Sequence, residues 1–107
     1  MTRKEELVLL AICRLNQGAY LVNIREHLNA FTDKKWSVGN VYVPLDRMCK
    51  LGYLESHIGD PTTKRGGKAI KYYKLTKKGI EALAEIKKVH DAMWTGLDHL
   101  AFNKREL

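Results

Sequence analysis

The chain has 107 residues, with 19 Lys and Arg against 12 Asp and Glu, and therefore a net charge of +7. This length is typical of one domain with a modest core, and a composition that is 45% hydrophobic excludes a disordered chain. No apolar run approaches the ~20 residues that a membrane span requires. The residues from Met1 to Glu6 lack the layout of a signal peptide, so we expect a cytoplasmic protein without a membrane partner.

The positive charge is concentrated in residues 64–78. This stretch holds seven of the 19 basic residues and no acid, so the other 12 basic residues balance the 12 acids. A basic segment beside a neutral body is typical of a protein that binds a polyanion, most often nucleic acid.

The first helix is predicted from a capping box, Thr2 with Glu5, in front of an apolar run from Leu7 to Leu15. The run is hydrophobic nearly all round, so we expect this helix to be deeply buried, and Gly18 to end it. A second, amphipathic helix is predicted from Tyr20 to Phe31.

Ser37 is a good N-cap for a third helix that runs to about Leu51, where Gly52 ends it. Pro44 lies inside this helix and predicts a kink or a tightened first turn. At 100° per residue the helix has a buried side and an outer side, with Tyr42 on the flank. The buried side comprises Val41, Leu45, Met48 and Cys49, and the outer side comprises Asn40, Val43, Arg47 and Lys50.

Two strands are predicted next, from Tyr53 to Ile58 and from Ala69 to Leu75, joined by a glycine-rich basic loop. Thr76 can cap a last helix from about Lys77 to the low hundreds, with a length of about 40 Å. Part of such a helix must project from so small a body.

The last helix carries apolar residues in steps of three or four, interrupted by a histidine. A projecting seam of this kind favours pairing with a second copy of the chain. The predicted dimer interface comprises Ile80, Leu83, Ile86, His90, Met93, Trp94, Leu97 and Leu100.

The order of three helices followed by a hairpin predicts a mainly α fold with a small β-hairpin (α+β), a winged helix-turn-helix. Residues 1–75 would form the DNA-binding domain and residues 76–107 the dimerisation helix, in one compact unit. In this fold the third helix enters the major groove of double-stranded DNA. Asn40 and Arg47 suit adenine and guanine, and Val43 suits a thymine methyl group. The residues suited to phosphate contacts are Tyr20, Lys35, Tyr42 and Lys50.

Short motifs in this order resemble the PadR-like transcriptional regulators. They are Gly18-x-Tyr20, Ser37-x-Gly39-Asn40-Val41-Tyr42, Leu45-x-Arg47-Met48, Gly52-Tyr53-Leu54-Glu55-Ser56, Gly66-Gly67-Lys68 and Lys71-Tyr72-Tyr73-x-Leu75-Thr76-x-x-Gly79. The resemblance implies a dimeric DNA-binding repressor whose final helix forms the dimer interface. It also implies DNA contacts from Asn40 and Tyr42 and from the wing residues Lys64, Arg65 and Lys68, and Ser37 is a further candidate for a DNA contact.

Two departures from the family pattern concern geometry. The family often places proline directly after the tyrosine of the third helix, whereas Val43 stands between Tyr42 and Pro44 here. Gly96 is a candidate break in a final helix that is commonly continuous in the family.

No catalytic, cofactor or metal motif is visible, which predicts a protein that is not an enzyme. Cys13 and Cys49 belong to no C-x-x-C pair and lie in apolar helical patterns, so we expect buried free thiols. Trp94, with Met93 beside it, is a candidate site for a small planar aromatic effector, as in a few members of the family. Ordinary packing in the dimer interface is the alternative.

Other interpretations remain open at this point. The outer side of the third helix is also compatible with a solvated face. The same fold can serve as a protein-interaction module that binds an acidic partner, or as an RNA-binding module. Exposed aromatic residues would favour RNA, but Tyr72 and Tyr73 alternate along one strand, so at most one of them is exposed.

Overall fold

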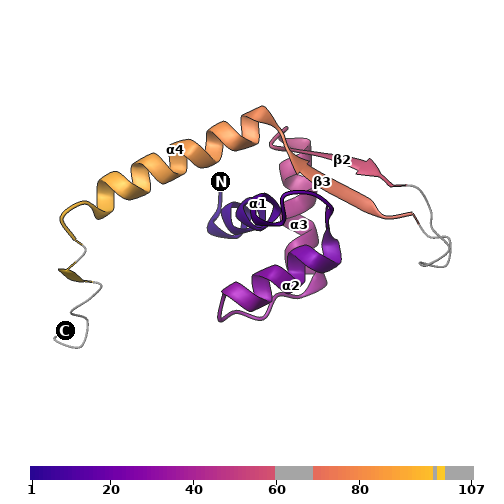
Figure 1. Cartoon of the computed structure of the whole chain (residues 1–107), viewed down its shortest axis with the longest axis horizontal. Helices are drawn as coiled ribbons and strands as arrows, with labels where there is room; N and C mark the ends of the chain where they lie inside the picture. Colours follow the sequence, from indigo (N-terminus) through magenta and orange to yellow (C-terminus); the bar gives the residue numbers. More distant parts are fainter. Residues whose placement is uncertain (60–68, 98, 101–107) are drawn as a thin grey trace.

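The computed structural model describes residues 1–59, 69–97 and 99–100. The elements in chain order are α1 (Arg3–Leu15), β1 (Ala19–Tyr20), α2 (Leu21–Phe31), α3 (Val38–Lys50), β2 (Leu54–Ile58), β3 (Lys71–Leu75) and α4 (Lys77–Trp94). The helices α1, α2 and α3 pack together, and Figure 1 shows the β2–β3 hairpin extending to one side of them and α4 extending to the other. The predicted α+β winged-helix fold is confirmed.

The core lies between α1, α2 and α3 and is closed by one side of the sheet. Its residues are Val8, Leu9, Ala11, Ile12, Ala19, Ile24, Leu28, Trp36, Val41, Leu45, Met48, Leu54 and Tyr73. The predicted buried side of α3 is confirmed for Val41, Leu45 and Met48, each with no exposed surface, while Cys49 is half-buried.

The expectation that α1 is buried all round is wrong. Leu10 is 39% exposed and Cys13 is also exposed, so the predicted buried thiol at Cys13 is wrong as well. Both side chains lie on the side of α1 that faces α4, where the chain supplies too few residues to cover them. The capping box of Thr2 and Glu5 is confirmed.

The sheet has three antiparallel strands in the order β1-β3-β2. β1 was not predicted, and the second helix begins at Leu21 instead of Tyr20. The turn before β1 uses Gly18 at φ +75°, and Ala19 then pairs with Tyr73. A two-residue strand has no periodicity of its own, so it is defined only by the partner that lies far along the chain.

α4 is held against the body at its first turn. Thr76 caps the helix by accepting a hydrogen bond of 3.1 Å from the Gly79 N–H, as predicted. Gly79 lies directly against the backbone of Tyr53, and a Cβ at this position would be 2.2 Å from the Tyr53 carbonyl oxygen. Lys78 donates to the Leu51 carbonyl oxygen at 2.7 Å, which places a positive charge at the C-terminal end of α3.

The predicted length of the last helix is wrong. α4 ends at Trp94 after 18 residues, about 27 Å, and Leu97 and Leu100 lie beyond it. The Thr95 hydroxyl donates to the Asp91 carbonyl oxygen at 2.8 Å, and Gly96 follows at φ +83°, a left-handed conformation that ends helices. Gly96 therefore does mark the break.

Candidate nucleic-acid interface

The turn between α2 and α3 fixes where α3 begins. Trp36 is 3% exposed and makes three hydrogen bonds that join the turn to α2. Its backbone N–H donates to Asn29 at 2.8 Å, its indole N–H donates to Thr32 at 3.0 Å, and its carbonyl oxygen accepts from Arg25 at 2.7 Å. The sequence carried a signal for this anchor, since a large apolar residue directly before an N-cap often packs under the helix.

α3 starts at its predicted cap and presents its predicted outer side. The Ser37 hydroxyl accepts from the Asn40 N–H at 3.1 Å. Val43 is 65% exposed, Tyr42 is 48% exposed, and Asn40 is also exposed. Pro44 is buried inside a helix that continues without interruption to Lys50.

The outer side of α3 borders the N-terminus of α1. A hollow of about 290 Å³ lies between them, and its lining includes Thr2, the N-cap of α1, and Lys4 of α1, with Asn40 and Val43 from α3. Lys4 was not predicted as part of the interface, because nothing in its local sequence indicates that α1 begins beside α3.

Arg47 is exposed as predicted, but it is paired within the chain. Its Nε lies 2.7 Å from Oε2 of Glu5, and its side chain is 61% exposed. Burial raises the pKa of Glu5, but the hydrogen bond from the Thr2 N–H and the charge of Arg47 outweigh that effect and lower the pKa. The Glu5 carboxylate is therefore ionised at neutral pH.

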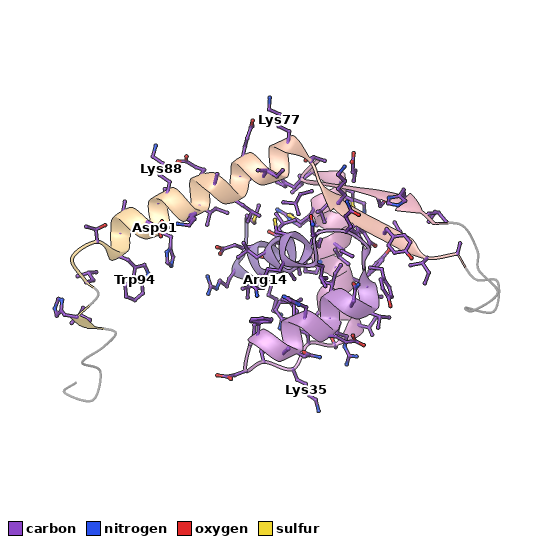
Figure 2. The ribbon with its side chains drawn as sticks, viewed as in Figure 1. Arg14, Lys35, Lys77, Lys88, Asp91 and Trp94 are labelled. Carbon is purple, nitrogen blue, oxygen red and sulfur yellow. The ribbon has the colours of Figure 1, made fainter. Side chains whose placement is uncertain are left out.

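Lys50 and Tyr42 lie on the flank of α3 opposite to the flank where Arg47 meets Glu5. The Lys50 ammonium is 2.9 Å from the Asp46 carboxylate, and this hydrogen bond raises the pKa of Lys50. Because this pair is exposed, the lysine can leave Asp46 for a phosphate at little cost. Lys35 is exposed at the turn before α3 (Figure 2).

Tyr20 was predicted to begin a helix, but it lies in the strand β1. Its ring packs edge-on against Tyr72, 5.9 Å away, and His57 stacks on the other side of Tyr72 at 5.5 Å. Tyr20, Tyr72 and His57 therefore form one row across the three strands, on the side away from the core. Tyr73 is buried and Tyr72 half-buried, as the alternation predicted.

The predicted wing contacts Lys64, Arg65 and Lys68 lie outside the described residues. The strands that lead to them, β2 and β3, are joined by a ladder of five residue pairs and extend away from the helices (Figure 1). At the end of this ladder Gly59 lies directly against the ring of Tyr72, where a Cβ would be 2.6 Å from the ring.

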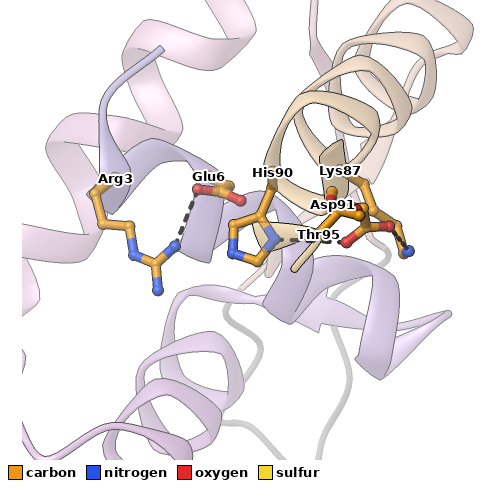
Figure 3. A network of polar contacts seen from close by, with 6 residues as sticks. All are labelled: Arg3, Glu6, Lys87, His90, Asp91 and Thr95. Carbon is orange, nitrogen blue, oxygen red and sulfur yellow. Dashed lines mark hydrogen bonds and ion pairs between the residues drawn. The ribbon is translucent and has the colours of Figure 1, made fainter. Parts of the chain in front are cut away.

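A second surface feature is a largely apolar groove of about 530 Å³ between α1 and α4. It is lined by Arg3, Glu6, Leu10, Cys13, Ile80, Leu83, Ala84, Lys87, His90 and Asp91. Polar residues of both helices contribute to this lining, and Figure 3 shows that Arg3 pairs with Glu6 and that Asp91 pairs with Lys87 and His90. The hydrogen bond from Lys87 lowers the pKa of Asp91.

The predicted dimer residues on α4 form two groups. Leu83 and Ile86 are half-buried, and Leu83 packs against the core. Ile80 is 57% exposed, Met93 71% and Trp94 44%, and the ring of His90 lies 6.1 Å from that of Trp94. Leu97 and Leu100, each 42% exposed, follow the helix break.

The described part of the chain contains no group of His, Cys, Asp and Glu that could hold a metal ion. None of its helices is long and apolar enough to cross a membrane. Burial raises the pKa of the Cys49 thiol, which therefore stays protonated at neutral pH.

The comparisons with known proteins agree with this fold. The family model described as "Transcriptional regulator PadR-like family" matches residues 9–85 of the chain. A crystal structure of a PadR-like transcriptional regulator from Bacillus cereus is 28% identical, with a TM-score of 0.72, covering 91% of this chain and 89% of that one. No curated protein matches the chain.

Two further crystal structures share the fold. A PadR family transcription regulator from Clostridium difficile has 23% identity and a TM-score of 0.69, with 91% of this chain and 97% of that chain covered. One from Eggerthella lenta has 23% identity and a TM-score of 0.69, with 89% and 80% covered. The chain thus belongs to the PadR-like family, a family of DNA-binding transcription regulators and not of enzymes.

Proposed function

We propose that two copies of this chain bind an inverted-repeat operator and repress transcription. In the proposed complex each copy inserts α3 into the major groove, with the basic wing on the neighbouring backbone. The observation that carries the proposal is the outer side of α3. It combines exposed Asn40 and Val43 with cations on both flanks, and it faces away from a helix core that is fully packed.

Dimerisation is supported by the unfilled groove between α1 and α4. The groove exposes Leu10 and Ile80 together, and α4 continues beyond the body with Met93 largely exposed. A second copy of the chain would cover the same apolar side chains on both partners, because two-fold pairing is self-complementary. The mixed charges at the edge of the groove suit a symmetric partner.

The proposal is tested by selecting bound sequences from a random DNA pool with the purified chain. We expect an enriched inverted repeat with half-sites about one helical turn apart, or a multiple of it. A protein-interaction module would enrich no sequence, and an RNA-binding module would prefer single-stranded RNA in a competition with the same pool. Either result would contradict the proposal.

Salt dependence tests the phosphate contacts. Lys35→Ala should lower the slope of log affinity against log salt by about one, since one phosphate contact is lost. Lys88→Ala is the matched control, because Lys88 is also exposed and unpaired among the described residues but lies on α4 (Figure 2). Equal slopes for the two variants would remove Lys35 from the interface.

We also propose a planar aromatic compound as effector, held by Trp94 and Met93. Trp94 is exposed in the last turn of α4, whereas Trp36 is buried, so added compounds can quench only Trp94 directly. A panel of planar aromatic compounds should quench the fluorescence of the native chain and not that of Trp94→Phe. Equal quenching of both proteins would contradict this role.

A further inference from the structure

We propose that Glu5 is a positioning residue that holds Arg47 in the orientation in which it reads a guanine. The proposal rests on the proposed function, since it assigns a specificity device to the same surface. It adds a residue from α1, outside the helix-turn-helix unit, to the elements that determine sequence preference.

The Glu5 carboxylate is fixed from two directions. Its Oε1 accepts from the Thr2 N–H at 2.7 Å, and its Oε2 lies 2.7 Å from Nε of Arg47. The Glu5 N–H in turn donates to the Thr2 hydroxyl at 3.1 Å. The residue is only 4% exposed, so this carboxylate has a single well-defined position.

This arrangement leaves the two terminal nitrogens of the Arg47 guanidinium available to a ligand. The Arg47 atom that pairs with Glu5 is Nε, and among the described residues the Arg47 side chain has no ion pair or hydrogen bond with any other residue. The two terminal nitrogens can therefore donate in parallel to O6 and N7 of a guanine. The side chain lies on the same outer side of α3 as Asn40 and Val43.

Holding the guanidinium in advance strengthens reading for a physical reason. A free arginine loses rotamer freedom when it binds a base, whereas an arginine that is already held loses much less. A carboxylate this close to DNA also carries a cost, because it repels phosphates. The sign of the effect of removing its charge therefore separates positioning from simple electrostatics.

Glu5→Gln is the decisive variant. In glutamine an NH2 group replaces one of the two carboxylate oxygens, so either the Thr2 N–H or the Nε–H of Arg47 faces a donor in place of its oxygen partner. The change also raises the net charge by one, which by itself would strengthen binding to any DNA. We expect the opposite for the selected operator, namely a loss of about tenfold in affinity. The preference for guanine at the position that Arg47→Ala relaxes should also weaken.

Two controls separate positioning from folding. Thr2→Ala removes a hydroxyl of the capping box but leaves the carboxylate on Arg47, so the base preference should remain native. Glu26→Gln on α2 adds the same unit of charge on an exposed residue and should not lower operator affinity.

A double-mutant cycle completes the test. In the Arg47→Ala background, Glu5→Gln should change operator affinity by less than about twofold, because the residue that it positions is gone. The inference is overturned if Glu5→Gln leaves base preference unchanged, tightens operator binding, or has its full effect without Arg47. If the native chain selects no sequence, the proposed function itself fails, which is a different result.

Discussion

α3 and α4 are both amphipathic helices that begin at a hydroxyl N-cap, yet the chain treats them differently. The inner side of α3 has no exposed surface at Val41, Leu45 and Met48, whereas α4 leaves Ile80 57% and Met93 71% exposed. A single chain thus buries the inner side of α3, the helix that we propose to read DNA. It leaves the apolar side of α4 exposed. Pairing of two copies would then set the distance between two reading helices and leave their internal packing unchanged.

The anchoring of α3 gives the largest expected effect. Trp36→Ala removes a buried indole and its hydrogen bond to the Thr32 hydroxyl, and should lower the free energy of unfolding by about 3–5 kcal/mol. Phe31→Ala is the control, since Phe31 is 63% exposed. Chemical denaturation at one fixed protein concentration measures both. Equal losses would show that the turn does not depend on Trp36.

A substitution on the exposed apolar side of α4 should disrupt the proposed dimer and gives the next largest effect. Ile80→Glu places a charge in the groove and should raise the dissociation constant of the dimer at least about tenfold, because it buries an unpaired carboxylate. Val89→Glu is the matched control, as Val89 is 52% exposed on the opposite side of the same helix. Sedimentation velocity over a range of concentrations distinguishes them. A dimer that survives Ile80→Glu would place the interface elsewhere.

Two glycines test how tightly each helix is held. Gly79→Ala in α4 forces a Cβ against the Tyr53 carbonyl oxygen and should cost about 1–3 kcal/mol of stability. Gly39→Ala in α3 meets open space and should instead add about 0.5–1 kcal/mol. Thermal and chemical unfolding of the two variants should therefore shift in opposite directions. Shifts of the same sign would contradict the difference in packing.

The smallest predicted effect is on acid stability. The pKa of Glu5 is lower in the folded chain than in the unfolded chain, so its stabilising contribution is complete above the unfolded pKa, about 4.3. That contribution is lost as pH falls through the folded pKa. Glu5→Gln should therefore be less stable than the native chain at pH 7, with a smaller difference near pH 3. A difference that does not change with pH would show that the Glu5 charge contributes nothing.

Much of the fold was predictable because its signals are local. The caps at Thr2, Ser37 and Thr76 and the apolar spacing of α3 each involve residues within one or two turns of one another. The two strands of the hairpin follow from β-branched and aromatic residues next to glycine-rich turns. The exposure of Cys13 was not predictable, because it depends on how little of α1 is covered by α4.

The part of the candidate site that depends on local spacing was also predictable, and the part that depends on contacts between distant residues was not. Helical spacing alone places Asn40, Val43 and Arg47 on the outer side of α3. The pairing of Arg47 with Glu5 joins residues far apart in the sequence and required the packing of α1 against α3. The short strand at Tyr20 is defined only by its pairing with Tyr72, so the row of aromatic residues on the sheet could not be inferred either.

The most direct test of the central claim compares two DNA fragments that carry the same selected half-sites. In one fragment the half-sites have their selected spacing, and in the other about five extra base pairs, half a helical turn, separate them. If paired α4 helices fix the distance between two reading helices, the insertion should weaken binding at least about tenfold. Equal affinity for the two fragments would show that each copy binds alone and would contradict the account.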